Sequence, residues 1–245
     1  VTMAQSRVVA CGSNSEGQLT VPVLPHELAY IQISAGIYHT VALRSDGSIV
    51  AWDNVWKDCK QPFFVPELPA ETKYVAVAAG GGHTLALRDD GSAVAWGNNS
   101  HGQTNVPEPP SGLSYVAVAA GWLHSAALLS DGTAVAWGDN SYGQLNVPEL
   151  APEASYVAIN AGAYHTLALR DDGTVAAWGW NYSGQINVPA LPPGLRYDEV
   201  AAGHAFSVAR RSDGSVVTRG PHGDGLSSGP QLPPGWTFVE IAAGG

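Results

Sequence analysis

Histidine recurs in this sequence at a spacing that could build a metal or ligand site. His39, His83, His124 and His165 each lie three residues after a glycine, in four successive copies of one unit. Imidazoles gathered around one point could hold zinc, which needs its ligands about 2 Å from the ion. Four histidines on four separate units are more naturally held apart, each hydrogen-bonded to a neighbouring strand. We therefore interpret this set as structural, and we expect no bound metal and no cofactor.

Aspartate and tryptophan also recur once in each unit. Asp-Gly pairs are typical of tight turns, and one or two acids per turn are too few to bind calcium. The tryptophans are expected to pack between units. No carboxylate pair, catalytic triad or metal spacing recurs, so we expect no enzymatic activity. The two sets are Asp46, Asp90, Asp131, Asp172 and Asp213, and Trp52, Trp96, Trp137 and Trp178, with Arg219 at the tryptophan position of a later unit.

A further group of aromatic residues departs from the repeated pattern. These residues occupy two kinds of loop, one between the glycine and the histidine and one after the Trp-Gly pair. Loops of a ring of units can gather on one face, and clusters of exposed Trp and Tyr are typical binding hot spots. The alternative is that these large side chains fill gaps between loops. The candidate partner-binding residues are Tyr38, Trp56, Trp122, Tyr142, Tyr164, Trp180 and Tyr182.

Trp56 lies in the one enlarged loop, residues 53–64, which is three residues longer than its equivalents. The loop also holds two of the three lysines. Insertions are placed in loops and often carry function. The other interpretation is a diverged copy in which Phe63 and Phe64 pack under the loop.

The elements that must position these residues repeat about every 41 residues. In the second unit, residues 74–78 and 83–88 read as strands, Asp90-Gly91 as a hairpin turn and residues 94–97 as a returning strand. The stretch that ends at Pro107 is expected to be a fourth, outermost strand. Four strands in such a period are typical of a β-propeller blade. An aromatic residue opens each unit, at residues 30, 74, 115, 156, 197 and 238, in steps of 44, 41, 41, 41 and 41.

We therefore predict an all-β fold, a single six-bladed β-propeller domain over residues 1–245. The sixth unit contains only a first strand, at residues 238–243. Strands near residues 1–11 are expected to complete that blade, which would remove the open sheet edges. Cys11 and Cys59 could pair, but nothing in the sequence requires it.

The composition agrees with this architecture and disfavours two classes of binding partner, nucleic acids and membranes. Glycine (29) and proline (17) make up 46 of the 245 residues, as a chain with many tight turns requires. The net charge of −10, with 11 scattered Lys and Arg, disfavours nucleic acid. The sequence contains no apolar run of about 20 residues, so we expect no membrane partner. We expect a monomer.

The run Ala-Gly-x-x-His-Thr-x-Ala-Leu-x-x-Asp-Gly-[Ser/Thr]-x-x-Ala-Trp-Gly resembles the repeat of the regulator-of-chromosome-condensation family. It is clearest at residues 79–97, 120–138 and 161–179, and the resemblance covers essentially the whole chain. Family members include nucleotide exchange factors and secreted bacterial inhibitors of β-lactamase, so the fold alone does not give the function. The short Asn-Val-Pro-[Glu/Ala]-Leu linkers look like those of the secreted bacterial members. This resemblance implies a secreted or extracellular bacterial protein whose aromatic loops contact a protein partner.

We therefore expect a binding module that recognises a protein surface through aromatic loops on one face. The resemblance implies inhibition of a secreted enzyme such as a β-lactamase. A carbohydrate-binding lectin is the alternative, because sugars also stack on Trp and Tyr. A lectin tends to repeat its site in every blade, whereas these aromatic residues differ between units, which favours a protein over a glycan. A structural or designed repeat without a ligand is a further alternative.

Overall fold

The computed structural model describes residues 20–52, 64–221, 233 and 236–244. Within these residues the secondary structure is entirely β, with five three-stranded antiparallel sheets of consecutive strands. The strands are β1 (Tyr30–Ala35), β2 (Thr40–Arg44), β3 (Ile49–Trp52), β4 (Tyr74–Ala79), β5 (His83–Arg88), β6 (Ala93–Gly97), β7 (Tyr115–Ala120), β8 (His124–Leu129), β9 (Ala134–Gly138), β10 (Tyr156–Ala161), β11 (His165–Arg170), β12 (Val175–Gly179), β13 (Tyr197–Ala202), β14 (Ser207–Arg211) and β15 (Val216–Arg219).

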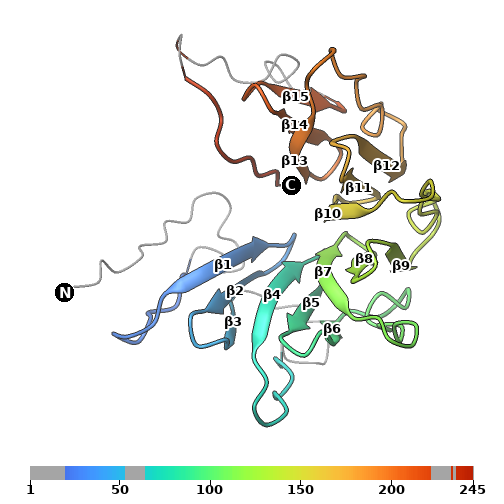
Figure 1. Cartoon of the computed structure of the whole chain (residues 1–245). Helices are drawn as coiled ribbons and strands as arrows, with labels where there is room; N and C mark the ends of the chain where they lie inside the picture. Colours follow the sequence, from blue (N-terminus) through green and yellow to red (C-terminus); the bar gives the residue numbers. More distant parts are fainter. Residues whose placement is uncertain (1–19, 53–63, 222–232, 234–235, 245) are drawn as a thin grey trace.

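The five sheets follow one another around a common centre, as blades of a propeller do (Figure 1). The first strand of each sheet, such as β4 or β7, lies nearest the centre and the third strand lies outside. The all-β propeller architecture predicted from the sequence is confirmed.

The Asp-Gly pairs form the turns between the second and third strands, as predicted. Gly91 has a φ of +79°, a left-handed conformation that favours glycine. The carboxylate of Asp90 accepts a hydrogen bond from the backbone N–H of Ser92 at 2.8 Å. Hydrogen bonds from Ser92 lower the pKa of the Asp90 carboxyl below its ordinary value. The same aspartate-to-backbone bond closes the other four turns, at Asp46, Asp131, Asp172 and Asp213.

The tyrosine that opens each unit explains the fixed spacing of tyrosine and proline. Tyr74 is buried, and its hydroxyl donates a hydrogen bond to the carbonyl oxygen of Pro66 at 2.8 Å. Tyr156 makes the same bond to Pro148 at 2.9 Å. The bond ties the linker before each sheet to the first strand of that sheet.

The predicted fourth strand is wrong in the second, third and fourth units, where the segment after the third strand is described and forms turns and irregular backbone. In the second unit the backbone N–H of Gly102 donates to Asn99, and that of Asn105 donates to Gly102, so neither is free for a sheet ladder. The segment is attached to the next blade through side chains instead. Trp137 Nε1 and Ser125 Oγ donate to the carbonyl oxygen of Gln103, at 2.9 and 2.8 Å.

The hydrophobic core is divided among the contacts between neighbouring blades. One cluster joins Val41 and Leu43 of the first blade to Val77 and Ala86 of the second. The predicted role of the tryptophans is confirmed, since all four are no more than 9% exposed. In the fifth blade Arg219 replaces the tryptophan, and its Nε donates to the carbonyl oxygen of Asn187 at 3.1 Å. Each blade is therefore stabilised mainly by its two neighbours.

The four histidines are structural, as predicted. Each is at most 1% exposed, and each Nε2 hydrogen-bonds a hydroxyl on the following blade. Burial lowers the pKa of His83 to about 3 and the pKa values of the other three to about 4, so all four are neutral near pH 7. The pairs are His39 with Thr84 (2.8 Å), His83 with Ser125 (2.9 Å), His124 with Thr166 (2.9 Å) and His165 with Ser207 (3.0 Å).

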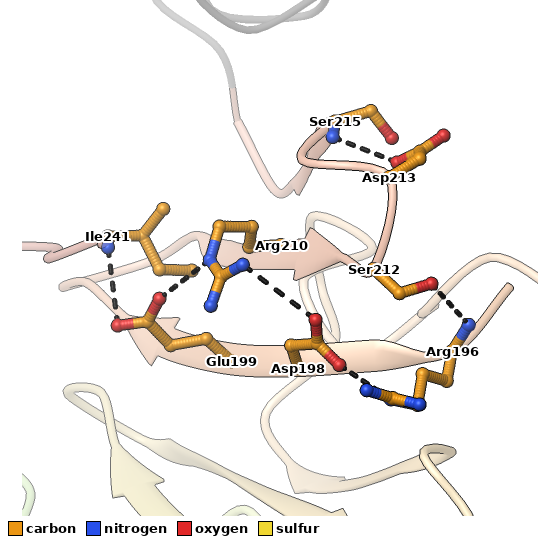
Figure 2. Close-up of polar contacts among 8 residues, drawn as sticks. All are labelled: Arg196, Asp198, Glu199, Arg210, Ser212, Asp213, Ser215 and Ile241. Atoms are coloured by element: carbon orange, nitrogen blue, oxygen red, sulfur yellow. Dashed lines mark hydrogen bonds and ion pairs between the residues drawn. The ribbon is translucent and has the colours of Figure 1, made fainter. Parts of the chain in front are cut away.

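Residues 236–244 continue the ring beyond the fifth sheet. The backbone N–H of Ile241 donates to Glu199 Oε1 at 3.2 Å, as that of Val77 donates to Gln32 in the first interface. Figure 2 shows Arg210 between Glu199 and Asp198, with nitrogen–oxygen distances of 3.0 and 3.8 Å. These end residues thus take the position of the first segment of a sixth unit.

Several predictions fall on residues outside the described part of the chain. These are the completion of a sixth blade by residues 1–11, the pairing of Cys11 with Cys59, and the position of Trp56. Of the enlarged loop only Phe64 is described, and its side chain is 66% exposed. The part of the chain that the structure describes contains no helix of the length and hydrophobicity needed to cross a membrane.

Candidate functional site

A cavity of about 320 Å³ lies on the central axis and is lined by residues of all five sheets together with Ala243 and Gly244. Its wall consists mostly of alanine and glycine, because the first strands approach each other closely there. A Cβ atom on Gly80 would collide with the carbonyl oxygen of Gly121 and with the ring of His83. Larger side chains from the loops, including Tyr38, Trp122 and His204, also contribute to the lining.

Five of the seven predicted binding residues form one continuous aromatic cluster beside this cavity. Tyr164 is its centre, with ring centroids 5.2 Å from Trp122, 5.2 Å from Tyr142 and 6.0 Å from Trp180. Trp180 in turn stacks on Tyr182, with centroids 6.4 Å apart and planes within 6°. We call Trp122, Tyr142, Tyr164, Trp180 and Tyr182 the aromatic cluster.

The cluster is open to solvent along one side. Tyr142 is 51% exposed and Tyr182 is 88% exposed, while the other three rings are half-buried. Exposed tyrosine and tryptophan offer large, rigid contact area at a low entropic cost. The arrangement is therefore suited to contact with another molecule, although the three half-buried rings also fill space between loops.

Backbone hydrogen bonds bring the two predicted kinds of loop together. The N–H of Trp180, in the loop after the third strand, donates to the carbonyl oxygen of Tyr164, in the loop before the histidine, at 2.8 Å. The N–H of Asp139 donates to the carbonyl oxygen of Leu123 at 2.9 Å in the preceding blade. Aromatic residues in either kind of loop therefore face the same end of the blade.

A buried glutamine holds the second kind of loop, and the sequence analysis missed it. Gln144 is fully buried, its Oε1 accepts from the N–H of Tyr142 at 2.7 Å, and its Nε2 donates to Asp139 at 2.8 Å. Gln103 and Gln185 stand at the same place in the adjacent blades and are also fully buried. The recurrence of Gly-Gln every 41 residues was the available signal.

Two predicted residues are not part of the aromatic cluster. Tyr38 lines the axial cavity from the first blade. Trp56 lies outside the described residues. The structure thus brings the predicted residues of the third and fourth units into one cluster, and Tyr38 of the first unit is not part of it.

Three residues at the cluster escaped the sequence analysis because their types are ordinary. A Cβ atom on Gly81 would overlap the indole of Trp122, so this glycine makes the space in which Trp122 lies. His204 extends the cluster, with its ring centroid 5.5 Å from that of Trp122. Asp139 adds the one carboxylate in the described loops of this face.

The carboxylate of Asp139 is held by neutral donors. Ser141 donates from its hydroxyl at 2.6 Å, and Gln144 donates from its amide at 2.8 Å. Burial raises the pKa of Asp139, but these hydrogen bonds outweigh it and the net pKa lies below the ordinary value. The pKa of Tyr164 is raised by burial, by Tyr142 and by the charge of Asp139. Asp139 is therefore ionised near pH 7 and acts electrostatically on the cluster.

In the described ranges, no three His, Cys, Asp or Glu side chains lie close enough together to bind a metal ion. The geometry of this face instead provides aromatic area, one carboxylate and backbone loops held in place.

Comparison of the sequence with known protein families agrees with the repeats seen in the structure. The regulator of chromosome condensation (RCC1) repeat matches residues 30–52, 74–103, 115–144 and 156–185. The chain therefore contains four RCC1 repeats. The fifth unit is not among the matches, and it is the unit in which Phe206 replaces the histidine and Arg219 the tryptophan. None of the curated proteins compared with the chain is a significant match.

Solved propellers share the fold at low identity. Prp20p from Saccharomyces cerevisiae, a protein described with its binding to Gsp1p and histones, is 24% identical, with a TM-score of 0.66 over 79% of this chain and 58% of its own. Human WBSCR16 is 19% identical, with a TM-score of 0.73 over 92% of this chain and 73% of its own. The ectodomain of the Physcomitrella patens receptor kinase CR4 is 20% identical, with a TM-score of 0.68 over 90% of this chain and 58% of its own. The RCC1-repeat chain thus spans little more than half the length of Prp20p and of the CR4 ectodomain.

Proposed function

We propose that this RCC1-repeat propeller is a non-enzymatic module that binds a protein surface through the aromatic cluster. The observation that carries the proposal is the continuous contact of five aromatic side chains from two kinds of loop on one face. Such a group supplies the anchor residues of an interface, and loops held by backbone bonds lose little entropy on binding.

The mode of action that we propose is occlusion of the partner. A face of this kind covers about 800 Å² of a partner surface, enough to block the entrance of an active site. In its most specific form, the proposal is that the protein is a secreted inhibitor of an enzyme such as a β-lactamase. This form rests on the short Asn-Val-Pro-[Glu/Ala]-Leu linkers, which look like those of the secreted bacterial members. Prp20p, a propeller of similar fold that is described with its binding to Gsp1p and histones, supports the more general form.

The test is a paired affinity capture from secreted and lysate proteins. The baits are the wild-type chain and a Trp122→Ala/Trp180→Ala variant of equal melting temperature. We expect one protein to be retained by the wild type and lost with the variant. Because the two tryptophans are half-buried, a Tyr142→Ala/Tyr182→Ala variant provides a second bait in which only more exposed rings are removed.

The matched control is Trp236→Ala. Trp236 is 70% exposed and lies two residues before Phe238, whose N–H donates to the Asp-Gly turn at Gly214, so it belongs to the opposite end of the sheets. Its variant should retain the captured protein. Equal recovery on all baits, or on none, contradicts the proposal, and specific binding on a glycan array would then support the lectin alternative.

A further inference from the structure

The charge of the aromatic face differs from that of the rest of the molecule. The described loops that form it, residues 36–39, 80–83, 97–106, 121–124, 138–147, 162–165, 179–188 and 203–206, contain no Lys or Arg and only one carboxylate, that of Asp139. The five Asp-Gly turns lie at the other end of the sheets. Among these described loops, Asp139 therefore carries the single negative charge beside the rings, while Arg219, at the end of β15, donates to the carbonyl oxygen of Asn187.

The charge of Asp139 has no Lys or Arg counterpart in the described loops. Its hydrogen-bond donors are the backbone and hydroxyl of Ser141 and the amide of Gln144, and all of them are neutral. Two histidines lie on this face. His101 acts electrostatically on Asp139 from the second blade, and its Nδ1 is hydrogen-bonded to Ser100 at 2.9 Å. The other, His204, lies against Trp122.

The rings of the aromatic cluster can receive a cation on their faces, and Gln144, which hydrogen-bonds both Asp139 and the N–H of Tyr142, connects the carboxylate to them. Tyr142 and Trp180 are tilted by 52° to each other, and Trp180 meets Tyr164 edge to face at 82°. With centroids only about 5 to 6 Å apart these rings leave no slot between them, so a cation would lie on their outward faces. A planar guanidinium stacks on such faces better than an ammonium group does.

We propose that the aromatic cluster and Asp139 together form a recognition site for an arginine side chain of the protein partner. The guanidinium would stack on the outward faces of the rings and pair with the carboxylate of Asp139. This inference rests on the proposed function and deepens it by naming the chemistry of the partner residue. A net charge of −10 for the whole chain favours the approach of a basic partner.

The chain itself supplies the variant that tests the carboxylate. Asn98 stands at the place of Asp139 in the second blade, and its Oδ1 accepts from the N–H of Ser100 at 2.8 Å and from Gln103 at 3.3 Å. In Asp139 these two donors use different oxygens, but an asparagine at position 139 can accept hydrogen bonds from both Ser141 and Gln144 on its one Oδ1, as Asn98 does. Asp139→Asn removes the charge and leaves the loop supported.

The experiment uses two tripeptides, acetyl-Gly-Arg-Gly-amide and the same peptide with citrulline, which is neutral and nearly the same shape as arginine. The indole N–H resonances of Trp122 and Trp180, assigned with single Trp→Phe variants, are followed by NMR during titration. We expect saturable shifts with the arginine peptide at millimolar concentration and little change with citrulline. Asp139→Asn should raise the Kd at least threefold, whereas Asp172→Asn, which removes one charge from an Asp-Gly turn, should leave the Kd unchanged.

Three results of the titration would overturn the inference. Equal shifts with citrulline would mean that the cluster does not select the charge. An unchanged Kd in Asp139→Asn would exclude the carboxylate, and an equal loss in Asp172→Asn would reduce the effect to net charge. In the capture experiment, a protein lost with Trp122→Ala/Trp180→Ala but fully retained by Asp139→Asn would support protein binding and contradict arginine recognition. Arginine binding without any captured protein would support arginine recognition and contradict the proposed protein binding.

Discussion

At the scale of the residue, this chain uses the same side-chain type for opposite purposes. His83 is buried and links two blades, whereas His204 is exposed and lies beside Trp122. Trp137 is buried between blades, whereas Trp122 is half-exposed at the axis. Position within the repeat decides the role, because a residue that recurs in every unit is constrained by the contact that recurs there.

The buried histidines predict a loss of stability in mild acid. In the unfolded chain a histidine titrates near 6.5, while in the folded chain burial holds the pKa values at about 3 to 4. As the pH falls from 6.5 towards 4, the unfolded chain takes up protons that the folded chain does not. The free energy of unfolding therefore decreases, by about 1.4 kcal/mol per pH unit for each histidine. Urea unfolding at several pH values measures this slope.

A His83→Phe variant tests the assignment, because Phe206 stands at the same place in the fifth blade. The variant should flatten the slope between pH 5.5 and 4.5 by about 1.4 kcal/mol per pH unit. Measurement at pH 8, where the protonation difference vanishes, gives the packing change alone. The turn aspartates do not interfere, because hydrogen bonds lower their pKa values equally in both proteins and their contribution cancels in the comparison. Parallel curves for the two proteins would contradict the prediction.

At the scale of the element, each blade is a three-stranded sheet whose first strand has to lie very close to its neighbours. The carbonyl oxygen of Gly121 accepts from the N–H of Gly81 at 3.0 Å, which brings the ends of β4 and β7 together at the axis. The repeated Ala-Gly ends of the first strands are the sequence counterpart of this closeness.

Two neighbouring glycines in the second blade test that closeness. Gly80→Ala places a Cβ atom against the Gly121 carbonyl oxygen and the His83 ring, so it should lower the free energy of unfolding by about 1 to 3 kcal/mol. Gly82→Ala is the matched control, because its Cβ atom would meet only Asn98 at an ordinary 3.4 Å. The control should be neutral or slightly more stable. Denaturant midpoints give both values, and equal losses would exclude crowding at the axis as the cause.

The sequence predicted the strands and turns well because they depend on local patterns. Residues 83–88 were predicted as a strand and form β5, and the Asp-Gly turns are as expected. The outer strand could not be excluded from the sequence, since Val106-Pro107 is compatible with an edge strand, and only the hydrogen bonds of Gln103 to the next blade show another arrangement.

The site was predicted in part, for a similar reason. Aromatic residues that break the repeat can be read directly, and Tyr164 and Trp180 indeed meet. Gly81 matters because it leaves space for Trp122, and Asp139 matters because it places a charge beside the rings. Both roles can be recognised only when the distance between two blades is known. No local pattern contains that distance.

At the scale of the whole molecule, stability depends on contacts passed from blade to blade. The N–H of Phe238 donates to Gly214 at 3.4 Å, a bond equivalent to that of Tyr74 with Gly47 at 3.1 Å. Residues 236–244 therefore present the surface of a further unit, and the strands predicted at residues 1–11 would cover it. An uncovered blade surface costs much of the stability of a ring built from nearest-neighbour contacts.

Deletion of residues 1–10 tests that prediction. We expect the melting temperature to fall by about 10 °C, because several kcal/mol are lost and each shifts the midpoint by roughly 2–4 °C in a chain of this size. Replacing these residues with a Gly-Ser segment of equal length should lower the melting temperature by the same amount. An unchanged melting curve in calorimetry would show that the segment does not complete the ring.

The two residues between the glycine and the histidine of each unit have a further consequence. Ile37-Tyr38, Gly81-Gly82, Trp122-Leu123, Ala163-Tyr164 and His204-Ala205 differ in size and chemistry, yet the glycine N–H bonds to the carbonyl of the histidine position in every blade. New specificities can therefore evolve at these pairs by point mutation while the scaffold is inherited unchanged. For protein engineering, the same pairs form a natural set of positions for a combinatorial library.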